Sequence, residues 1–201
     1  MTATTTPLAL SAEAQDLLFR EARTASAFTS EPVADEQLRA VHDLVKWAPT
    51  SMNTQPLRMV YVRGEDARAR LLPHMSEGNR AKVASAPVVA ILAADVDFHE
   101  HMGKVFPHFA GARDAMEANP GRAEMAKLNA ALQVGYFIVG VRAAGLAAGP
   151  MTGFDAEAVR AEFFAGTAQV PLVVVNIGHP DPEVSFPRNP RLDFEEISTV
   201  L

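Results

Sequence analysis

Two stretches of nearly uninterrupted apolar residues predict strands that are buried on both faces. Residues 87–94 and 171–177 lack the alternation of apolar and polar positions that marks a half-exposed strand. A shorter run over 59–62 is rich in β-forming residues and predicts a further strand. The chain therefore has a sheet at its core.

Helical spacing dominates much of the rest of the chain. Over 35–48, apolar residues recur every three or four positions after Asp35, a favourable N-cap, which predicts an amphipathic helix. Ser11 is a candidate cap for a first helix that runs to about residue 23. Leu17 and Leu18 are its expected apolar anchors.

The longest predicted helix, 123–144, carries apolar residues on nearly every face. Such a helix is buried on most sides, and in a short chain a second subunit often covers the side left open. Gly145 suits the position after its C-terminus, and further helices are predicted over 155–164 and after Asp193. Because helices and strands are interspersed without regular strand–helix–strand alternation, the predicted class is an α+β sandwich.

Segments rich in proline, glycine and polar residues separate these elements. Residues 49–56 and 149–153 are predicted loops. The irregular stretch 106–121 is interpreted as a mobile excursion or a lid. We expect a flexible, threonine-rich tail over 1–10, followed by a single domain over 11–201.

Composition and charge narrow the class of protein. The 201 residues carry 18 Lys and Arg against 24 Asp and Glu, a net charge of −6, with 48% hydrophobic content, which is typical of a globular protein. The acidic balance argues against nucleic-acid binding. No apolar stretch reaches the ~20 residues that cross a bilayer, and the N-terminus lacks the basic segment of a signal peptide. We therefore predict a cytoplasmic protein that binds neither nucleic acid nor membranes.

Several familiar chemistries are excluded or disfavoured. Cysteine is absent, which removes thiolate nucleophiles and cysteine-based metal sites. No phosphate-loop, dinucleotide-binding, nucleophile-elbow or zinc-protease motif occurs. His99, His101 and His108 lie within ten positions, but histidines two apart on a helix point in different directions. Surface or substrate-channel histidines are favoured over a metal site, and no metal is expected. Asp95 and Asp97 are interpreted as strand-end and helix-cap residues.

Three polar loops carry the remaining candidate chemistry. In the first, Arg23 with the hydroxyls of Thr24 and Ser26 can hold a phosphate, although an arginine at a helix C-terminus needs no ligand. In the second, the amides of Asn53 and Gln55 match the edge of a heterocycle, or simply cap the loop.

The third loop, 149–154, offers proline and methionine as an apolar plate for a ring, and glycines that allow close backbone approach. Arg188 and Arg191 add positive charge far along the chain and can meet Arg23 on one phosphate. Each signal is weak alone, and their order along the chain is the stronger observation.

That order resembles the signatures of the flavin-dependent nitroreductase family. The N-terminal signature is matched by Arg23-Thr24-x-Ser26-x-Phe28-x-x-x-Pro32-Val33, and the second by Ala48-Pro49-Thr50-Ser51-x-Asn53-x-Gln55-Pro56-x-Arg58. The third is matched by Gly145-Leu146-x-x-Gly149-Pro150-Met151-x-Gly153-Phe154, and the C-terminal basic motif by Pro190-Arg191-Leu192. Within the family, resemblance to the malonic semialdehyde reductase branch of pyrimidine degradation rests on Lys46-Trp47-x-Pro49-Thr50-Ser51, Phe106-Pro107-His108 and Leu192-x-Phe194-Glu195-Glu196.

The resemblance implies a homodimeric three-layer sandwich around a mainly antiparallel sheet, with FMN at the subunit interface and NADH or NADPH as co-substrate. It implies that the flavin, and no catalytic side chain, carries the chemistry. The cofactor-binding residues that it implies are Arg23 and Arg191 at the phosphate, Thr24 and Ser26 near the phosphate or ribityl chain, Ser51, Asn53 and Gln55 at the isoalloxazine edge, Pro150, Met151, Thr152 and Gly153 along one ring face, and Lys82 near N1 and O2.

The implied reaction is hydride transfer from NAD(P)H through flavin N5 to a small substrate. Malonic semialdehyde, reduced to 3-hydroxypropionate, is the candidate from the branch resemblance. Phe106, His108 and Arg113 are candidate substrate residues, with Arg113 for a carboxylate. The alternatives are a nitroaromatic or quinone reductase, a flavin oxidase of a secondary metabolite, and a flavin-binding protein without turnover.

Overall fold

A computed structural model describes residues 8–184 and 186–201, so most of the predicted tail, 1–7, lies outside the described residues. One antiparallel sheet has the strand order β1-β2-β4-β3. Its strands are β1 (Leu57–Val62), β2 (Val88–Asp95), β3 (Ala147–Met151) and β4 (Gln169–Gly178). The helices are α1 (Ala12–Gln15), continued by a π-helical turn (Asp16–Arg20), α2 (Asp35–Val45), α3 (Gly64–Leu71), α4 (Glu77–Ser85), α5 (Met102–Val105), α6 (Ala112–Glu117), α7 (Arg122–Ala143), α8 (Ala156–Phe163) and α9 (Phe194–Ile197), with 3₁₀ turns at Ser51–Asn53, Leu72–His74 and Phe98–His101.

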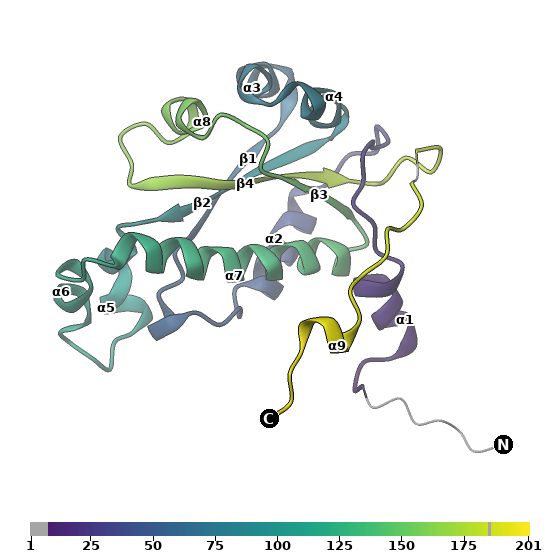
Figure 1. Cartoon of the computed structure of the whole chain (residues 1–201). Coiled ribbons are helices and arrows are strands. Elements are labelled where there is room, and N and C mark those ends of the chain that lie inside the picture. Colours follow the sequence, from purple (N-terminus) through teal and green to yellow (C-terminus); the bar gives the residue numbers. More distant parts are fainter. Residues whose placement is uncertain (1–7, 185) are drawn as a thin grey trace.

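Helices cover both faces of the sheet. Figure 1 shows α3, α4 and α8 on one face, and α2 and α7 on the other. Every residue of β2 is buried. Its side chains alternate between the two cores, with Val89 and Ile91 in one and Ala90 and Leu92 in the other. The predicted three-layer α+β sandwich and the two-sided burial of the strand at 87–94 are confirmed.

The long helix predicted over 123–144 is confirmed as α7, and it ends just before Gly145, as the glycine predicts. Gly145 has a φ of +74°, the left-handed conformation that glycine adopts without strain. The Gly145 N–H donates to the carbonyl of Arg142 at 2.9 Å, and the Leu146 N–H donates to that of Val141 at 3.2 Å. These two hydrogen bonds form a Schellman motif, which turns the chain directly into β3.

One side of α7 is buried against α2 and the sheet, and the other is exposed. A Cβ on Gly140 would lie 2.2 Å from Cγ1 of Val45 on α2, so glycine is required for the two helices to pack this closely. On the exposed side, Leu128, Leu132 and Tyr136 are 66%, 51% and 48% exposed. In a single chain, α7 therefore presents an apolar stripe to solvent.

The expected turn at 149–153 is wrong, because this segment largely belongs to strand β3. Within the sheet β3 pairs only with β4, and Pro150 is tolerated because an edge strand need not use every N–H. The 49–56 loop contains the short turn Ser51–Asn53, and the predicted excursion 106–121 contains α6. The lid role of that segment and the division into tail and single domain stay predictions.

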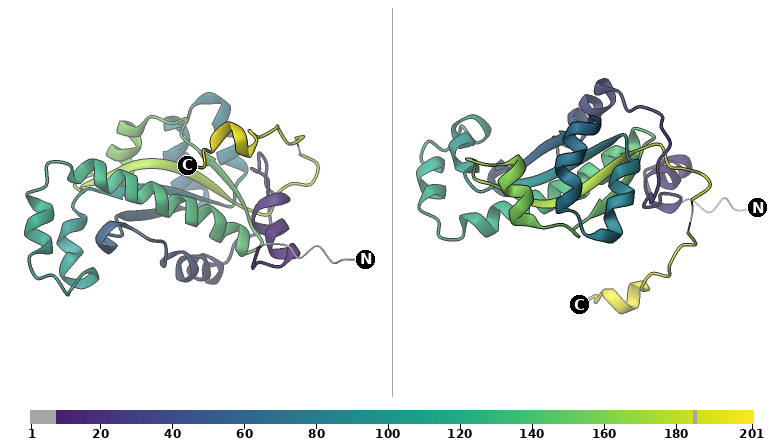
Figure 2. Two further views of the ribbon diagram at one scale, coloured as in Figure 1. Left: turned by 60° about the horizontal axis from the view of Figure 1, so that its bottom comes forward. Right: turned by 90° about the horizontal axis from the view of Figure 1, so that it is seen from above.

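Two details of the helix ends also differ from expectation. The first helix ends at Arg20 instead of near residue 23, and its expected anchor Leu17 is 49% exposed. The N-cap of α2 is Ala34, not Asp35. By contrast, the helix predicted over 155–164 is confirmed as α8, as is the short helix after Asp193, α9. Figure 2 shows α9 on a C-terminal segment that leads away from the sheet.

Candidate functional site

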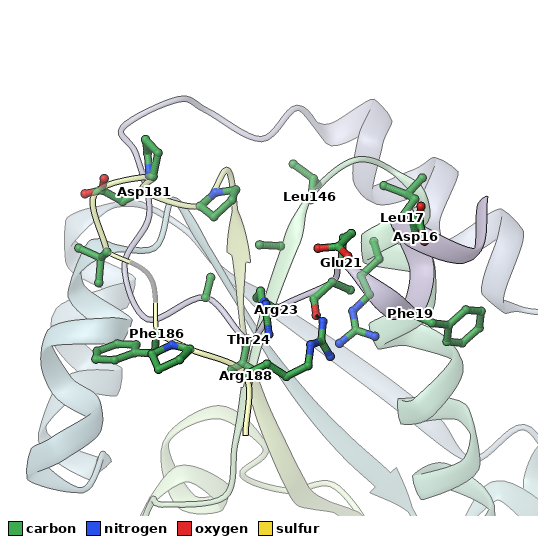
Figure 3. A pocket seen from close by; sticks show the side chains of 18 of the residues that line it. Asp16, Leu17, Phe19, Glu21, Arg23, Thr24, Leu146, Asp181, Phe186 and Arg188 are labelled. Carbon is green, nitrogen blue, oxygen red and sulfur yellow. Dashed lines mark hydrogen bonds between the residues drawn. The ribbon is translucent and has the colours of Figure 1, made fainter. Parts of the chain in front are cut away.

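A groove of about 730 Å³ lies where the start of β3 meets the end of the first helix and the C-terminal segment. Four arginines line it: Arg23, Arg142, Arg188 and Arg191. Figure 3 shows Arg23, Thr24 and Arg188 together in this groove. The fold therefore brings together the arginines that the sequence places at opposite ends of the chain.

Three acidic residues, Asp16, Glu21 and Asp181, line the groove together with the four arginines. Within residues 8–184 and 186–201, none of the four arginines forms an ion pair with a carboxylate, and three of them donate to backbone carbonyls instead. Arg188 donates to the carbonyls of Arg20 and Ala22, Arg191 to those of Asn189 and Pro190, and Arg142 to that of Leu18. Burial, and then the neighbouring charge of Arg188, lower the pKa of Arg142. Such a groove favours an anion with several oxygens, such as a phosphate.

The segment that follows Arg23 runs along the outer edge of β3. Thr24 bridges to Ala148 in a parallel arrangement. A Cβ on Gly149 would lie 2.9 Å from the carbonyl oxygen of Ala25, so glycine is needed for this close approach. Ser26 is half-buried further along the same segment. The predicted phosphate and ribityl residues therefore lie beside the strand that leads to 150–153.

Beyond β3, residues 152–153 contact α4. The carbonyl of Gly153 accepts hydrogen bonds from the Ser76 N–H and from Asn79 Nδ2, each at 3.0 Å. A Cβ on Gly153 would lie 2.5 Å from Asn79 Nδ2. Lys82 follows Asn79 by three positions, so the two side chains are neighbours on α4. Sequence reasoning missed Asn79, because its only signal is an asparagine inside a helix.

The remaining predicted cofactor residues, Ser51, Asn53 and Gln55, lie at the opposite edge of the sheet, just before β1. Strands β2 and β4 separate β1 from β3, which puts roughly 14 Å between the two edges at ordinary strand spacing. One copy of the chain therefore carries two separate groups of predicted flavin residues and does not bring them together.

The loop before β1 has an unusual backbone. Met52, Asn53 and Gln55 have φ angles of 51°, 55° and 42°, a region that non-glycine residues rarely occupy. Gln55 Nε2 donates to Asn53 Oδ1 at 2.9 Å, and Asn53 Nδ2 donates to the carbonyl of Val105, at the end of α5, at 2.8 Å. The amides are thus held in a defined arrangement at the surface.

The candidate substrate residues lie on the 106–121 segment. The rings of Phe106 and His108 are 3.9 Å apart. Arg113 makes ion pairs with Glu100, Asp114 and Glu117 at 2.7, 3.0 and 2.8 Å. Its hydrogen bonds lower the pKa of Glu100, and the three carboxylates raise the pKa of Arg113 above its usual value. A substrate carboxylate would have to compete with these three partners.

The histidine and carboxylate side chains in the described part of the chain do not form a metal-binding cluster. No three His, Asp or Glu side chains there lie close enough to hold a metal ion. His99 is buried, its Nδ1 has no hydrogen-bond partner among the residues that the structure describes, and its Nε2 lies 3.3 Å from Glu100 Oε1. Within the same residues, no helix has the length and apolar character needed to span a membrane.

The fold is shared with solved structures of nitroreductase-type proteins. A Bacillus subtilis protein provisionally described as a nitroreductase has a TM-score of 0.83 and 25% identity, covering 94% of this chain and 99% of that one. A nitroreductase-type protein from Exiguobacterium sibiricum, solved in complex with FMN, has a TM-score of 0.83 and 17% identity, covering 98% and 100%.

Sequence comparison identifies the family. The nitroreductase family model matches residues 19–179. A Streptomyces coelicolor protein provisionally named NADH dehydrogenase/NAD(P)H nitroreductase is 58% identical over 195 residues, 96% of this chain and 99% of its own. A Leptothrix cholodnii protein of the same name is 57% identical over 194 residues, covering 96% and 98%. The chain belongs to the nitroreductase family.

Proposed function

We propose that this chain is an FMN-dependent NAD(P)H oxidoreductase that reduces small acceptors such as nitroaromatics and quinones. The observation that carries the proposal is the groove at the edge of β3, where four arginines that make no ion pair within the described residues meet in a protein of net charge −6. Relatives named for NAD(P)H nitroreductase activity, and a neighbour of the same fold that binds FMN, support it.

The donor set of the groove fits FMN. Arg23 and Arg191 would hold the phosphate, with Thr24 and Ser26 near the phosphate or ribityl chain. Arg142 and Arg188 add charge to the same groove. When bound, FMN would supply the redox chemistry by taking a hydride from NAD(P)H and delivering it to the acceptor, while the protein supplies position and electrostatics.

The chain's own residues have distinct tasks in this proposal. Pro150, Met151, Thr152 and Gly153 would line one face of the ring and exclude water from it. The hydrogen bonds from Ser76 and Asn79 to the Gly153 carbonyl hold the end of this segment in place. Lys82, beside Asn79 on α4, would place a cation near N1 and O2, where negative charge is then better tolerated.

A homodimer completes the site. Ser51, Asn53 and Gln55 lie at the β1 edge, away from the groove, so a partner subunit is needed to bring a second set of these amides to the ring. The stripe of Leu128, Leu132 and Tyr136 on α7 supplies an apolar surface for that partner. Further apolar side chains are exposed on the C-terminal segment, namely Leu192, Phe194 and Ile197. A cytoplasmic location stays a prediction.

Malonic semialdehyde stays a substrate hypothesis. It needs a cation for its carboxylate, and the predicted residue, Arg113, already binds three carboxylates. This geometry favours nitroaromatic and quinone acceptors, which need no such partner. Phe106 and His108 on the same segment would then contact the ring of the acceptor.

The test is an anaerobic substrate panel on FMN-loaded protein. Bound FMN is first reduced with NADH or NADPH, and its reoxidation by nitrofurans, quinones and malonic semialdehyde is compared. Fast reoxidation by nitrofurans or quinones supports the proposal, whereas preference for malonic semialdehyde selects the narrower hypothesis. Bound FMN that no acceptor reoxidises would favour a flavin-binding protein without turnover.

A further inference from the structure

Two buried polar side chains on α7 hold both ends of the loop over residues 51–57. Asn129, 4% exposed, accepts the Ser51 N–H through Oδ1 at 2.7 Å. Gln133, 7% exposed, accepts the Leu57 N–H through Oε1 at 3.0 Å. Because the two residues are four positions apart, they lie on the same side of the helix.

Both side chains sit on a helix that is otherwise apolar on its buried side. A buried amide costs free energy unless its hydrogen bonds are made, and an apolar residue would fill the same space without that cost. Asn129 is fixed further, since its Nδ2 donates to the carbonyl of Met125 at 2.8 Å. The two amides therefore serve a purpose beyond packing α7 against the sheet.

That purpose is the shape of the loop. Met52, Asn53 and Gln55 all occupy the left-handed region, and non-glycine residues stay there only when their surroundings impose it. The hydrogen bonds from Ser51 and Leu57 to α7 fix the loop at each end of this strained stretch. Released from them, the three residues would relax toward ordinary φ angles and redirect the amides of Asn53 and Gln55.

We propose that Asn129 and Gln133 are positioning residues that preset the 51–57 loop for the edge of the flavin ring. The inference rests on the proposed function, because it gives Asn53 and Gln55 the ring edge as their ligand. Asn129 and Gln133 accept hydrogen bonds from the loop and act through it. Preorganised donors and acceptors bind more tightly because less order is lost on binding.

The test compares variants by FMN affinity, by the visible absorption spectrum of bound FMN and by thermal stability. Gln133→Leu removes the acceptor for the Leu57 N–H, and we expect roughly tenfold weaker FMN binding, the size of one lost hydrogen bond, with a shifted spectrum. Gln133→Glu keeps an acceptor oxygen and should restore both. Thr54→Val is the matched control in the same loop, because the buried Thr54 hydroxyl has no hydrogen-bond partner in the described residues.

The outcomes separate the possible explanations. If Gln133→Leu lowers the melting temperature but leaves FMN affinity and spectrum unchanged, the residue is merely structural and the inference is overturned. If Gln133→Leu does not fold, Asn129→Ala decides by the same criteria, since it removes the acceptor for the Ser51 N–H at the other end of the loop. If the unmodified protein binds no FMN, the proposed function itself fails, and the inference fails with it.

Discussion

Replacing Arg23 by glutamine removes one cation from the arginine groove and leaves a shorter, neutral amide side chain. Arg23 is exposed, and among the described residues it has no ion-pair partner, so the substitution strands no buried carboxylate. The free energy of unfolding should therefore change by less than about 0.5 kcal/mol. Any effect on ligand binding can then be attributed to the lost charge.

The expected effect on FMN follows from one charge-assisted hydrogen bond. Bonds to charged groups contribute about 1.5–3 kcal/mol, which corresponds to roughly 10- to 100-fold in the dissociation constant. Three arginines remain in the groove, so we expect a value near the lower end. Affinity for riboflavin, which lacks the phosphate, should not change.

The assay is a fluorescence titration of the apoprotein with FMN and, separately, with riboflavin. Arg160→Gln is the matched control: Arg160 lies on α8, does not line the groove and makes no ion pair in the described residues. It should bind both flavins as the unmodified protein does. An Arg23→Gln variant with unchanged FMN affinity, or with equal losses for FMN and riboflavin, would refute the phosphate assignment.

Three further predictions concern assembly, packing and pH. Leu132→Glu should shift the protein from dimer to monomer in sedimentation, because the interface would bury an unpaired carboxylate; an unchanged dimer would show that the α7 stripe is not the interface. Gly140→Ala should lower the free energy of unfolding by about 1–3 kcal/mol, the usual cost of overpacking, since the new Cβ would meet Val45. Gly78→Ala is the control, because nothing lies within 4 Å of its Cβ. It should leave the free energy of unfolding almost unchanged in the same denaturation assay. Burial raises the pKa of the Tyr61 hydroxyl from 10.0 to about 12. The unfolded state therefore loses this proton first, and the free energy of unfolding should fall as pH rises from 10 to about 12. Tyr61→Phe should make this decrease less steep, and an equally steep decrease in the variant would contradict the assignment.

The elements that could be predicted from the sequence are those whose buried residues form a local pattern of apolar positions. The strand at 87–94 and the helix at 123–144 have long apolar patterns, and Gly145 marks the helix end in the expected way. Strand β3 was missed because Gly149 and Pro150 are strong turn signals. They belong instead to an edge strand whose close approach to Ala25 requires glycine, a tertiary constraint that the local pattern does not contain.

In the candidate site, too, some features could be predicted from the sequence and others depend on contacts between distant residues. The sequence predicts that Arg23 and Arg191 lie near each other, and the fold places both in one groove. The three left-handed residues and their support from Asn129 and Gln133 were not foreseen, because hydrogen bonds across 76 and 78 residues leave no local pattern. Asp114 and Glu117 lie one and four positions after Arg113 and are visible in the sequence, whereas its third partner, Glu100, lies on a different element and is not.

The central claim is that this chain binds FMN and passes electrons from a nicotinamide nucleotide through it. The most direct measurement is anaerobic addition of NADH or NADPH to the FMN-loaded protein while the visible absorption of bound flavin is recorded. We expect that at least one of the two nucleotides bleaches the flavin colour within a catalytic timescale, and that a nitrofuran or quinone restores it. Bound flavin that keeps its full absorption with both nucleotides would contradict the account.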